Sequence, residues 1–283
     1  MAEHRPLFHH VILTPFNCAR SRNPNEAHLA FRSRPGWIEE RFELFERYCL
    51  PSVLAQTSQD FLWMIYFDRS TAGEYLERAQ RGLAGRTNCF INLCNLYGSE
   101  TVQADLAKDL DPSLKWLVTT RLDNDDGLHH DFVRALHAEV CIGREEALDF
   151  PWGIVYANGV PYLSRQKCNA FISLSEPMEN LRTVLSVRHK EMARRYPVRE
   201  IGKKPIWLQS VHGSNVGNKI RGWRIAHAKM SEGFDIGEKS PSDTKTNFGI
   251  SVENATLGVG RLLRDRLADT WNTIKRPPWV IAP

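Results

Sequence analysis

Short apolar runs alternate with amphipathic stretches along the first half of the chain, which is the pattern of an α/β domain. Strands are predicted at residues 9–16, 61–68, 88–97 and 114–127. The spacing of apolar positions predicts helices at residues 35–57, 74–85, 100–110 and 129–141, the first of them interrupted by Pro51. Strands that alternate with helices form a mainly parallel sheet, and ligands bind beyond the carboxyl ends of its strands. Asp68 and the acidic run 123–126 are therefore expected on one rim of that sheet.

The second half of the chain has a different pattern. Residues 151–177 hold short apolar runs separated by Asn158-Gly159 and by a polar turn, which predicts β-hairpins. The remaining expected elements are a helix at 179–197 whose early part could instead be extended, a strand from residue 205 that enters a glycine- and asparagine-rich loop, an irregular loop at 231–254, and a basic amphipathic helix at 257–276. We expect a single domain over 1–283, made of a nucleotide-binding half (1–140), an acceptor and metal half (141–230), and a loop with a C-terminal helix (231–283).

Composition narrows the class of protein. A hydrophobic content of 42% and a charged content of 25% are ordinary for a globular protein, and a net charge of +4 is too small to indicate nucleic-acid binding. No apolar run approaches the ~20 residues that span a bilayer. The six cysteines form no CxxC pair, which favours free thiols in a reducing compartment. We expect a cytoplasmic protein, with docking of the C-terminal helix on the inner face of a membrane as an alternative to packing on the domain.

The strongest chemical signal is the run "RLDNDDG", in which Asp123, Asp125 and Asp126 follow an apolar strand directly. Carboxylates this close need a positive partner, and a divalent cation with oxygen ligands is the natural one. An EF-hand loop does not fit, because its turn glycine would fall on Leu128 and its bidentate glutamate on Arg134. A phosphatase with an aspartyl nucleophile also uses paired acids at a strand end. A solvated acidic turn that caps the next helix remains the structural alternative.

A second stretch, "SVLAQTSQDFLWMIYFDRST" over 52–71, resembles the opening of inverting family-2 glycosyltransferases. The chain departs from that family at "FDRST", where Arg69 replaces the glycine of "DDGST". Together with "WLVTTRLDNDDGL" and "IWLQSVHGSNV", the chain resembles the bacterial rhamnosyltransferase group. The resemblance implies an α/β, GT-A-like fold, a mixed and mainly parallel sheet flanked by helices, with C-terminal hairpins and a terminal amphipathic helix.

The resemblance also implies a metal, because such enzymes carry an acid-x-acid motif after a later strand and often complete the metal shell with a late histidine. The metal-binding candidates are Asp123, Asp125, Asp126 and His212. Carboxylates together with an imidazole favour Mn²⁺ over Ca²⁺, and Mg²⁺ is the other candidate. We expect Asp125 or Asp126 to hold the cation against a diphosphate, while Asp123 faces the ribose or a metal-bound water.

The expected activity is the transfer of a sugar, such as rhamnose or another deoxyhexose, from a nucleotide-diphosphate sugar to a glycan or lipid-linked acceptor. The candidates for binding the donor are Thr14, Phe16, Asn17, Asp68, Arg121, Asp123, Lys203 and Asn215, of which Asp68 would contact the base by resemblance. Strand packing explains Thr14 and Phe16 equally well. The candidate catalytic bases are Glu176, Glu179 and His189. A metal-dependent phosphatase or nucleotide-sugar hydrolase, and a non-catalytic sugar-binding protein, remain as alternatives.

Overall fold

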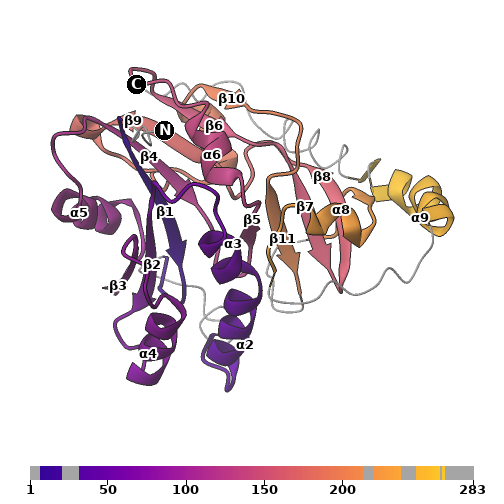
Figure 1. The fold of residues 1–283 in the computed structure, drawn as a ribbon, viewed down its shortest axis with the longest axis horizontal. Helices are drawn as coiled ribbons and strands as arrows, with labels where there is room; N and C mark the ends of the chain where they lie inside the picture. Colours follow the sequence, from indigo (N-terminus) through magenta and orange to yellow (C-terminus); the bar gives the residue numbers. More distant parts are fainter. Residues whose placement is uncertain (1–6, 21–31, 213–218, 237–246, 262, 265–283) are drawn as a thin grey trace.

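The computed structural model describes residues 7–20, 32–212, 219–236, 247–261 and 263–264, and these form two sheets with helices packed around them (Figure 1). The larger sheet has the strand order β10-β6-β9-β4-β1-β2-β3. Its strands are β1 (His9–Pro15), β2 (Leu62–Asp68), β3 (Cys89–Cys94), β4 (Trp116–Arg121), β6 (Glu146–Asp149), β9 (Ser173–Pro177) and β10 (Val198–Glu200). All pairings are parallel except those of β9 with β4 and β6. The predicted fold class is confirmed.

The smaller sheet has the order β12-β8-β7-β11-β5. Its strands are β5 (Gly127–Leu128), β7 (Trp152–Ala157), β8 (Val160–Arg165), β11 (Trp207–Val211) and β12 (Trp223–Arg224). The predicted hairpin is β7–β8, and its turn residues Asn158 and Gly159 have φ values of 50° and 75°. Positive φ at both central residues is the requirement of a tight hairpin turn, which explains the Asn-Gly pair.

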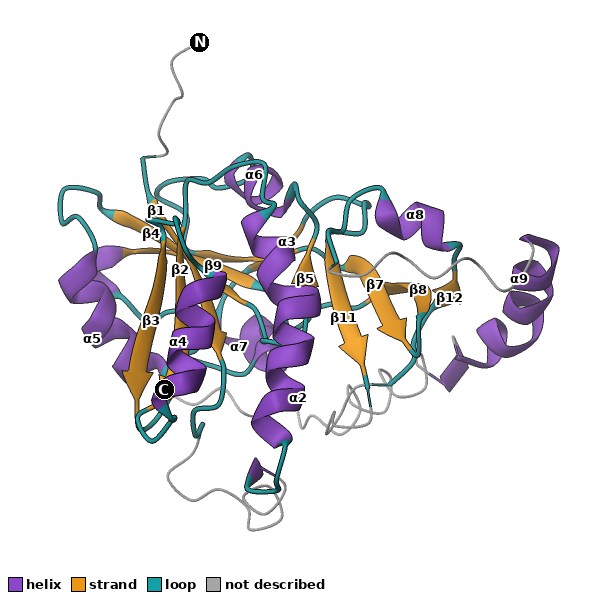
Figure 2. Ribbon diagram, turned by 60° about the horizontal axis from the view of Figure 1, so that its bottom comes forward, coloured by secondary structure: helices purple, strands orange, loops and turns teal. Residues whose placement is uncertain are grey.

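Helices cover the large sheet and separate it from the small one (Figure 2). They are α2 (Trp37–Leu44), α3 (Leu50–Leu54), α4 (Gly73–Gly82), α5 (Ser99–Asp109), α6 (Phe132–His137), α7 (Met192–Arg195), α8 (His227–Ser231) and α9 (Asn247–Glu253). Short 3-10 or π turns are η1 (Phe45–Cys49), η2 (Met178–Asn180), η3 (His189–Glu191) and η4 (Asn254–Gly258). In both ribbon views the α2–α3 rod stands between the two sheets. Among the described residues, the helices are too short or too polar to cross a membrane.

The first predicted helix runs on through Pro51 instead of stopping there. A proline has no N–H to donate and crowds the preceding turn, so a regular α-helix cannot contain it without adjustment. The chain adjusts by widening the turn just before it into the π-helical η1. Two buried aromatic side chains of that turn, Phe45 and Tyr48, face the cores on either side of the rod.

Two predicted elements are wrong. The helix expected at 179–197 is mostly irregular, because the buried carboxylate of Glu176 accepts the backbone N–H groups of Arg182 and Thr183 at 2.9 and 2.7 Å and draws the chain out of helical geometry. The irregular loop expected at 231–254 contains α9. Most of the predicted C-terminal helix lies outside the described residues.

A pair of histidines in the core predicts an acid-sensitive fold. The His10 ring lies 3.0 Å from the His137 ring and 2.9 Å from the Thr120 hydroxyl. Burial lowers the pKa of both rings, that of His137 to about 4. Below pH 6.5 the unfolded chain therefore binds more protons than the folded one. The stability that the neutral pair allows is complete above pH 6.5 and is lost as the pH falls toward 4.

We expect the free energy of unfolding in urea to fall between pH 7 and pH 5 by about 1–2 kcal/mol more in the wild type than in His137→Gln. The glutamine keeps a polar group opposite His10 and does not titrate. Equal pH slopes for the two proteins would show that the pair does not titrate in this window.

Candidate active site

The acidic run lies where the chain crosses from one sheet to the other. It follows β4, whose last residue Arg121 pairs with Leu13 of β1, so it begins at the carboxyl edge of the parallel strands. The Asp126 N–H donates to the Asp123 carbonyl at 3.1 Å and closes a tight turn. The next residue, Gly127, already belongs to β5 of the small sheet. The run thus lies at a strand end and also connects the two sheets.

A cleft of about 550 Å³ opens beside the first acid of the run. Its lining comes from the carboxyl ends of β1 and β4, from residues 97–98 before α5, and from the segment that leads into α7. The charged groups on its walls are Arg20, Arg121, Asp123, Arg188 and Glu191. Three guanidinium groups against two carboxylates give the cleft a net positive lining, which suits an anionic ligand such as a diphosphate.

Asp123 is the acid that faces this cleft. Its side chain is 36% exposed, and one carboxylate oxygen lies 2.7 Å from the Arg20 guanidinium. Arg20 comes from the loop after β1, so the ion pair joins the ends of two neighbouring strands. An exposed pair of this kind adds little to stability. Its position on the cleft wall is what makes Asp123 a functional candidate.

Asp125 is buried and held by two partners. Its carboxylate lies 2.9 Å from His212 Nε2 at the end of β11, and 3.0 Å from the guanidinium of Arg41 on α2. Arg41 also donates to the side-chain oxygen of Asn124 at 2.7 Å. Burial alone would raise the pKa of Asp125, but the hydrogen bond to His212 and the charge of Arg41 lower it to about 2. Asp125 is therefore an anion that joins α2, β11 and the acidic turn.

Asp126 points away from the cleft. It is 2% exposed, and its carboxylate accepts the backbone N–H of Ser210 on β11 at 2.9 Å. Burial, together with the nearby charges of Asp125 and Asp123, raises its pKa well above the usual range. The contact with Ser210 joins the acidic turn to the small sheet, and the assignment of Asp126 as a metal ligand stays a prediction.

Two of the four predicted metal ligands fit one cation. Adjacent ligand atoms around an octahedral Mg²⁺ at about 2.1 Å lie about 3 Å apart. The 2.9 Å between the Asp125 carboxylate and His212 Nε2 matches such a pair, and a carboxylate with an imidazole also suits Mn²⁺. In the structure the positive charge beside Asp125 is that of Arg41.

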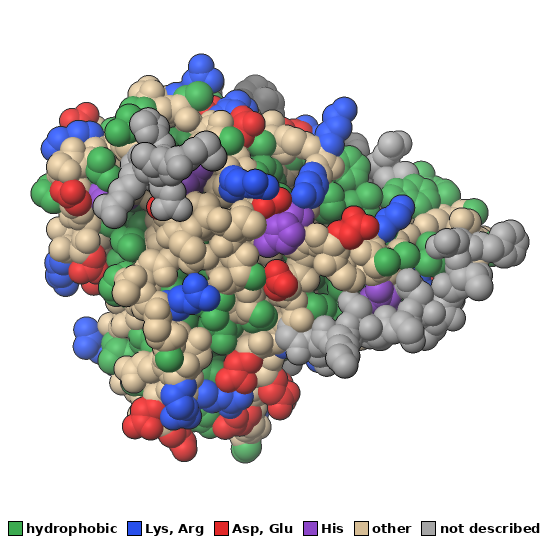
Figure 3. All heavy atoms as spheres, in the orientation of Figure 1, with side chains coloured by type: hydrophobic (Ala, Val, Ile, Leu, Met, Phe, Trp, Pro, Cys, Tyr) green, Lys and Arg blue, Asp and Glu red, His purple; other side chains and the backbone are tan. Residues whose placement is uncertain are grey.

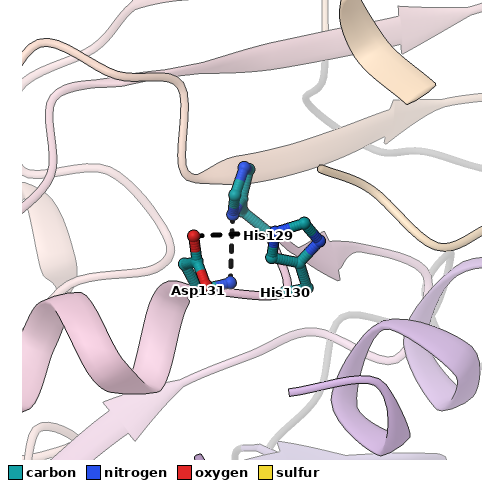
Figure 4. Close-up of side chains that lie close together, drawn as sticks. All are labelled: His129, His130 and Asp131. Atoms are coloured by element: carbon teal, nitrogen blue, oxygen red, sulfur yellow. Dashed lines mark hydrogen bonds and ion pairs between the residues drawn. The ribbon is translucent and has the colours of Figure 1, made fainter. Parts of the chain in front are cut away.

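A different group of ligand atoms converges at the start of α6 (Figure 4). Within the described ranges, His129, His130 and Asp131 are the group whose ligand atoms all lie within 4.8 Å of one another. The Asp131 carboxylate, however, already lies 2.8 Å from Arg134 and 3.7 Å from Lys204. These contacts describe an ion-paired helix start, and a metal ion there would have to share Asp131 with Arg134, as one at Asp125 would share that carboxylate with Arg41. Figure 3 shows that acidic, basic and histidine side chains lie close together on the face of the molecule seen in the orientation of Figure 1.

Two predicted donor-binding residues at the end of β1, Thr14 within the strand and Phe16 directly after it, have packing roles. Thr14 is fully buried and its hydroxyl accepts the Trp63 indole N–H at 2.9 Å. Phe16 stacks on Phe67 with ring centroids 4.4 Å apart. Of the two explanations open for these residues, the structure favours strand packing.

Asn17 and Asp68 lie on the predicted rim and organise it. The Asn17 side chain accepts the N–H of Asp68 at 2.9 Å and donates to the Thr71 hydroxyl at 2.9 Å. The Asp68 carboxylate accepts the N–H of Ser70 at 2.9 Å and its hydroxyl at 2.6 Å. These bonds shape the "FDRST" turn at the carboxyl end of β2, next to the edge that carries the acidic run.

Three other candidates lie away from the acidic run. Glu176 is fully buried on β9 opposite Leu117, about 13 Å or more along β4 from its carboxyl end. Glu179 lies in η2, beyond that same amino end of β4. Lys203 precedes β11, whose far end carries His212. The structure therefore places these three residues apart from the acidic run. The sequence could not show this, because it did not give the direction and pairing of the strands that carry them.

Arg121 and His189 lie close to the cleft, and their roles in donor binding and catalysis stay predictions. Arg121 lines it, and burial lowers the pKa of its guanidinium. His189 lies between the lining residues Arg188 and Glu191, and its Nδ1 lies 2.7 Å from the Cys168 carbonyl. Burial lowers the pKa of His189, which favours the neutral ring. Asn215 lies outside the described residues.

Sequence reasoning missed four charged residues of this region, namely Arg20, Arg41, Arg188 and Glu191. None of them stands in a motif. Arg41 lies on a helix that contributes mainly aromatic residues to the core, and Arg188 and Glu191 lie in a stretch that looks helical. No local pattern points to them, because tertiary packing alone brings them to the acidic run.

The fold and the cleft at the carboxyl ends of its strands define the class as a glycosyltransferase-like α/β protein. A family model described as "Putative rhamnosyl transferase" matches residues 12–224, which is more than half of the chain. The chain belongs to this family. No curated protein matches it.

Solved structures are similar to the chain at low sequence identity. S. aureus TarS in complex with UDP-GlcNAc matches with a TM-score of 0.43 and 11% identity, over 73% of this chain and 60% of that one. TarS in complex with UDP gives 0.40 and 11%, over 72% and 60%. A "putative nucleotide-diphospho-sugar transferase" from Desulfovibrio desulfuricans G20 gives 0.37 and 12%, over 72% and 81%. This chain spans 60% of the TarS chains, and likeness at this level says nothing about what it binds.

Proposed function

We propose that this protein transfers a sugar, rhamnose or another deoxyhexose, from a nucleotide-diphosphate sugar to a glycan or lipid-linked acceptor. One observation carries the proposal: in a chain of the rhamnosyl transferase family, Asp123 and three arginines line a cleft at the carboxyl ends of β1 and β4. That edge is where open α/β sheets bind their ligands. The net positive lining matches the charge of a diphosphate.

The arginines are proposed to bind the donor diphosphate. Arg121 and Arg188 present guanidinium groups to the cleft from β4 and from the segment before α7. A guanidinium binds phosphate oxygens through two parallel hydrogen bonds, so it orients the diphosphate as well as neutralising it. As the sugar–phosphate bond breaks, negative charge grows on the departing diphosphate. Positive groups fixed at that place stabilise the transition state more than the ground state.

Asp125 and His212 are proposed to hold a Mn²⁺ or Mg²⁺ ion, with Asp123 on the donor side. The bound ion supplies further neutralisation of the leaving diphosphate. To accept the ion, Arg41 must share Asp125 with it, and His212 Nε2 must give up the proton that it directs at Asp125. Arg41 therefore holds Asp125 in place before the ion binds.

Glu191 is proposed to accept the proton of the acceptor hydroxyl. With Glu176 and Glu179 far from the cleft, Asp123 and Glu191 are the carboxylates among the lining residues. Asp123 is paired with Arg20 at 2.7 Å, whereas Glu191 lies 4.0 Å from Arg194, so Glu191 is the group better suited to a base. Its neighbour His189 is the second candidate, because a neutral imidazole can also take a proton.

A thermal-shift panel of nucleoside diphosphates, with and without Mn²⁺, tests the proposal. We expect one nucleotide at saturating concentration to raise the melting temperature by roughly 5–10 °C, largely in a metal-dependent manner. Arg188→Ala should lose most of this shift, whereas Arg195→Ala, an exposed arginine of nearby α7, should retain it. An equal response to every nucleotide, or to none, would count against a donor site in this cleft.

The products of turnover distinguish the proposal from its alternatives. Sugar transfer yields nucleoside diphosphate together with a glycosylated acceptor. A nucleotide-sugar hydrolase would instead yield nucleoside diphosphate with free sugar, or nucleoside monophosphate with sugar phosphate, and inorganic phosphate as the main product would indicate a phosphatase. Glycan binding without turnover of any sugar nucleotide would indicate a sugar-binding protein.

A further inference from the structure

Two buried thiols touch each other beside the carboxyl edge of the large sheet. The Cys18 and Cys94 sulfurs lie 3.3 Å apart, and the side chains are 5% and 4% exposed. Cys18 lies in the loop after β1 and Cys94 is the last residue of β3, and β2 lies between those two strands. The loop after β1 therefore crosses the end of β2 to bring the sulfurs together.

Backbone contacts hold the two thiols in this arrangement. Ala19, next to Cys18, forms a parallel bridge with Leu96, and the Tyr97 N–H donates to the Ala19 carbonyl at 2.8 Å. The Arg69 N–H donates to the Cys94 carbonyl at 3.3 Å and ties the end of β3 to the end of β2. The sulfurs need to approach by only about 1.3 Å to reach the ~2.05 Å of a disulfide bond.

One of the thiols can be reached by a small oxidant. Cys94 lines a second cleft of about 740 Å³, which is also lined by Arg69 and Asn95 and lies on the other side of the Ala19–Leu96 bridge from the Asp123 cleft. The thiol–thiol contact with Cys18 lowers the pKa of Cys94. Cys94 is thus the more reactive sulfur of the pair, since the thiolate is the nucleophile.

We propose that Cys18 and Cys94 form a reversible disulfide when the protein meets a peroxide. The Cys94 thiolate attacks one oxygen of hydrogen peroxide and becomes a sulfenic acid, and the other oxygen leaves as water. The Cys18 sulfur then attacks the Cys94 sulfur and expels a second water. Two thiols are oxidised, one peroxide is reduced to two waters, and a dithiol reductant restores both thiols.

The bond would fasten the loop that leads to the proposed donor site. Cys18 lies between Asn17, which holds the turn after β2, and Arg20, which holds Asp123. A covalent link to β3 restrains this loop and closes a long segment of chain. Because cross-links across long segments restrict the unfolded chain most, we expect the oxidised protein to melt roughly 5–10 °C higher than the reduced one.

Peptide mapping tests the proposal. The protein is treated with hydrogen peroxide, its remaining thiols are blocked with N-ethylmaleimide, and it is cleaved with trypsin. Cleavage after Arg20 and Arg86 places Cys18 and Cys94 in separate peptides, the latter shared with Cys89. We expect one cross-linked pair that dithiothreitol separates.

Cys89→Ser is the matched control, because it removes the other thiol of the same peptide. It should keep the cross-link and the shift in melting temperature, whereas Cys94→Ser should lose both. Wild-type mapping decides the matter even if a variant fails to fold. The proposal is overturned if both Cys18 and Cys94 carry N-ethylmaleimide after peroxide treatment, or if Cys94 is oxidised to the sulfinic acid while Cys18 stays free.

Discussion

Replacing Asp123 with alanine is expected to lower the rate of sugar transfer on the order of 10²–10³-fold while leaving the fold intact. The acid faces the proposed donor cleft, where its loss removes a group that positions the donor and leaves the Arg20 guanidinium without its partner. The effect on stability should be small, about 1 kcal/mol or less, because the side chain is 36% exposed and its ion pair is screened by water. Initial rates of nucleoside diphosphate release and a thermal melt measure the two quantities.

The matched control for this variant is Asp60→Asn, an exposed acid before β2 and away from the cleft. It should retain the activity of the wild type. If Asp123→Ala transferred sugar at the wild-type rate, Asp123 would have no part in the reaction. If it unfolded instead, its role would be structural.

The next two acids of the run are expected to differ in how much stability is lost when each is replaced. Asp125→Ala should destabilise the protein by about 3–5 kcal/mol, because it leaves Arg41 buried without its anion and His212 without its hydrogen-bond partner. The melting temperature should fall by roughly 8–15 °C. Asp126→Asn should lower the free energy of unfolding by about 1 kcal/mol or less. The pKa of this carboxyl group is already raised, which favours its neutral form, and the amide oxygen can still accept the Ser210 N–H.

Each of these variants is the control for the other, since they stand next to each other and both remove one carboxylate. Urea unfolding at pH 7 gives the comparison directly. Similar losses for the two variants would contradict the assignment of the charge to Asp125. A larger loss for Asp126→Asn would reverse it.

The sequence predicted the α/β half of the fold because its signals are local. Apolar runs such as 61–68 have the length and composition of strands buried on both faces, and the Asn158-Gly159 pair carries its own turn geometry. The acidic run was also visible from the sequence, since three carboxylates at a strand end require an explanation. The parallel order of the strands then placed Asp68 and Asp123 on one edge.

The sequence predicted that Asp123 faces the donor but left open which of Asp125 and Asp126 would hold the cation, because their contacts come from residues distant in the chain. Arg41 meets Asp125 across 84 positions of sequence, and Ser210 meets Asp126 across an equal number. The helix expected at 179–197 failed for a similar reason, since the buried carboxylate of Glu176 determines the path of a segment whose own pattern looks helical. Long-range polar contacts thus decide which of the three carboxylates lines the cleft.

A crystal structure with the nucleoside diphosphate selected by the thermal-shift panel and Mn²⁺ tests the central claim most directly. We predict that the diphosphate lies in the cleft beside Asp123, with Arg121 and Arg188 on its oxygens, and that the anomalous signal of manganese lies between Asp125, His212 and the diphosphate. A nucleotide bound outside this cleft, or manganese held by His129, His130 and Asp131 instead, would contradict the account.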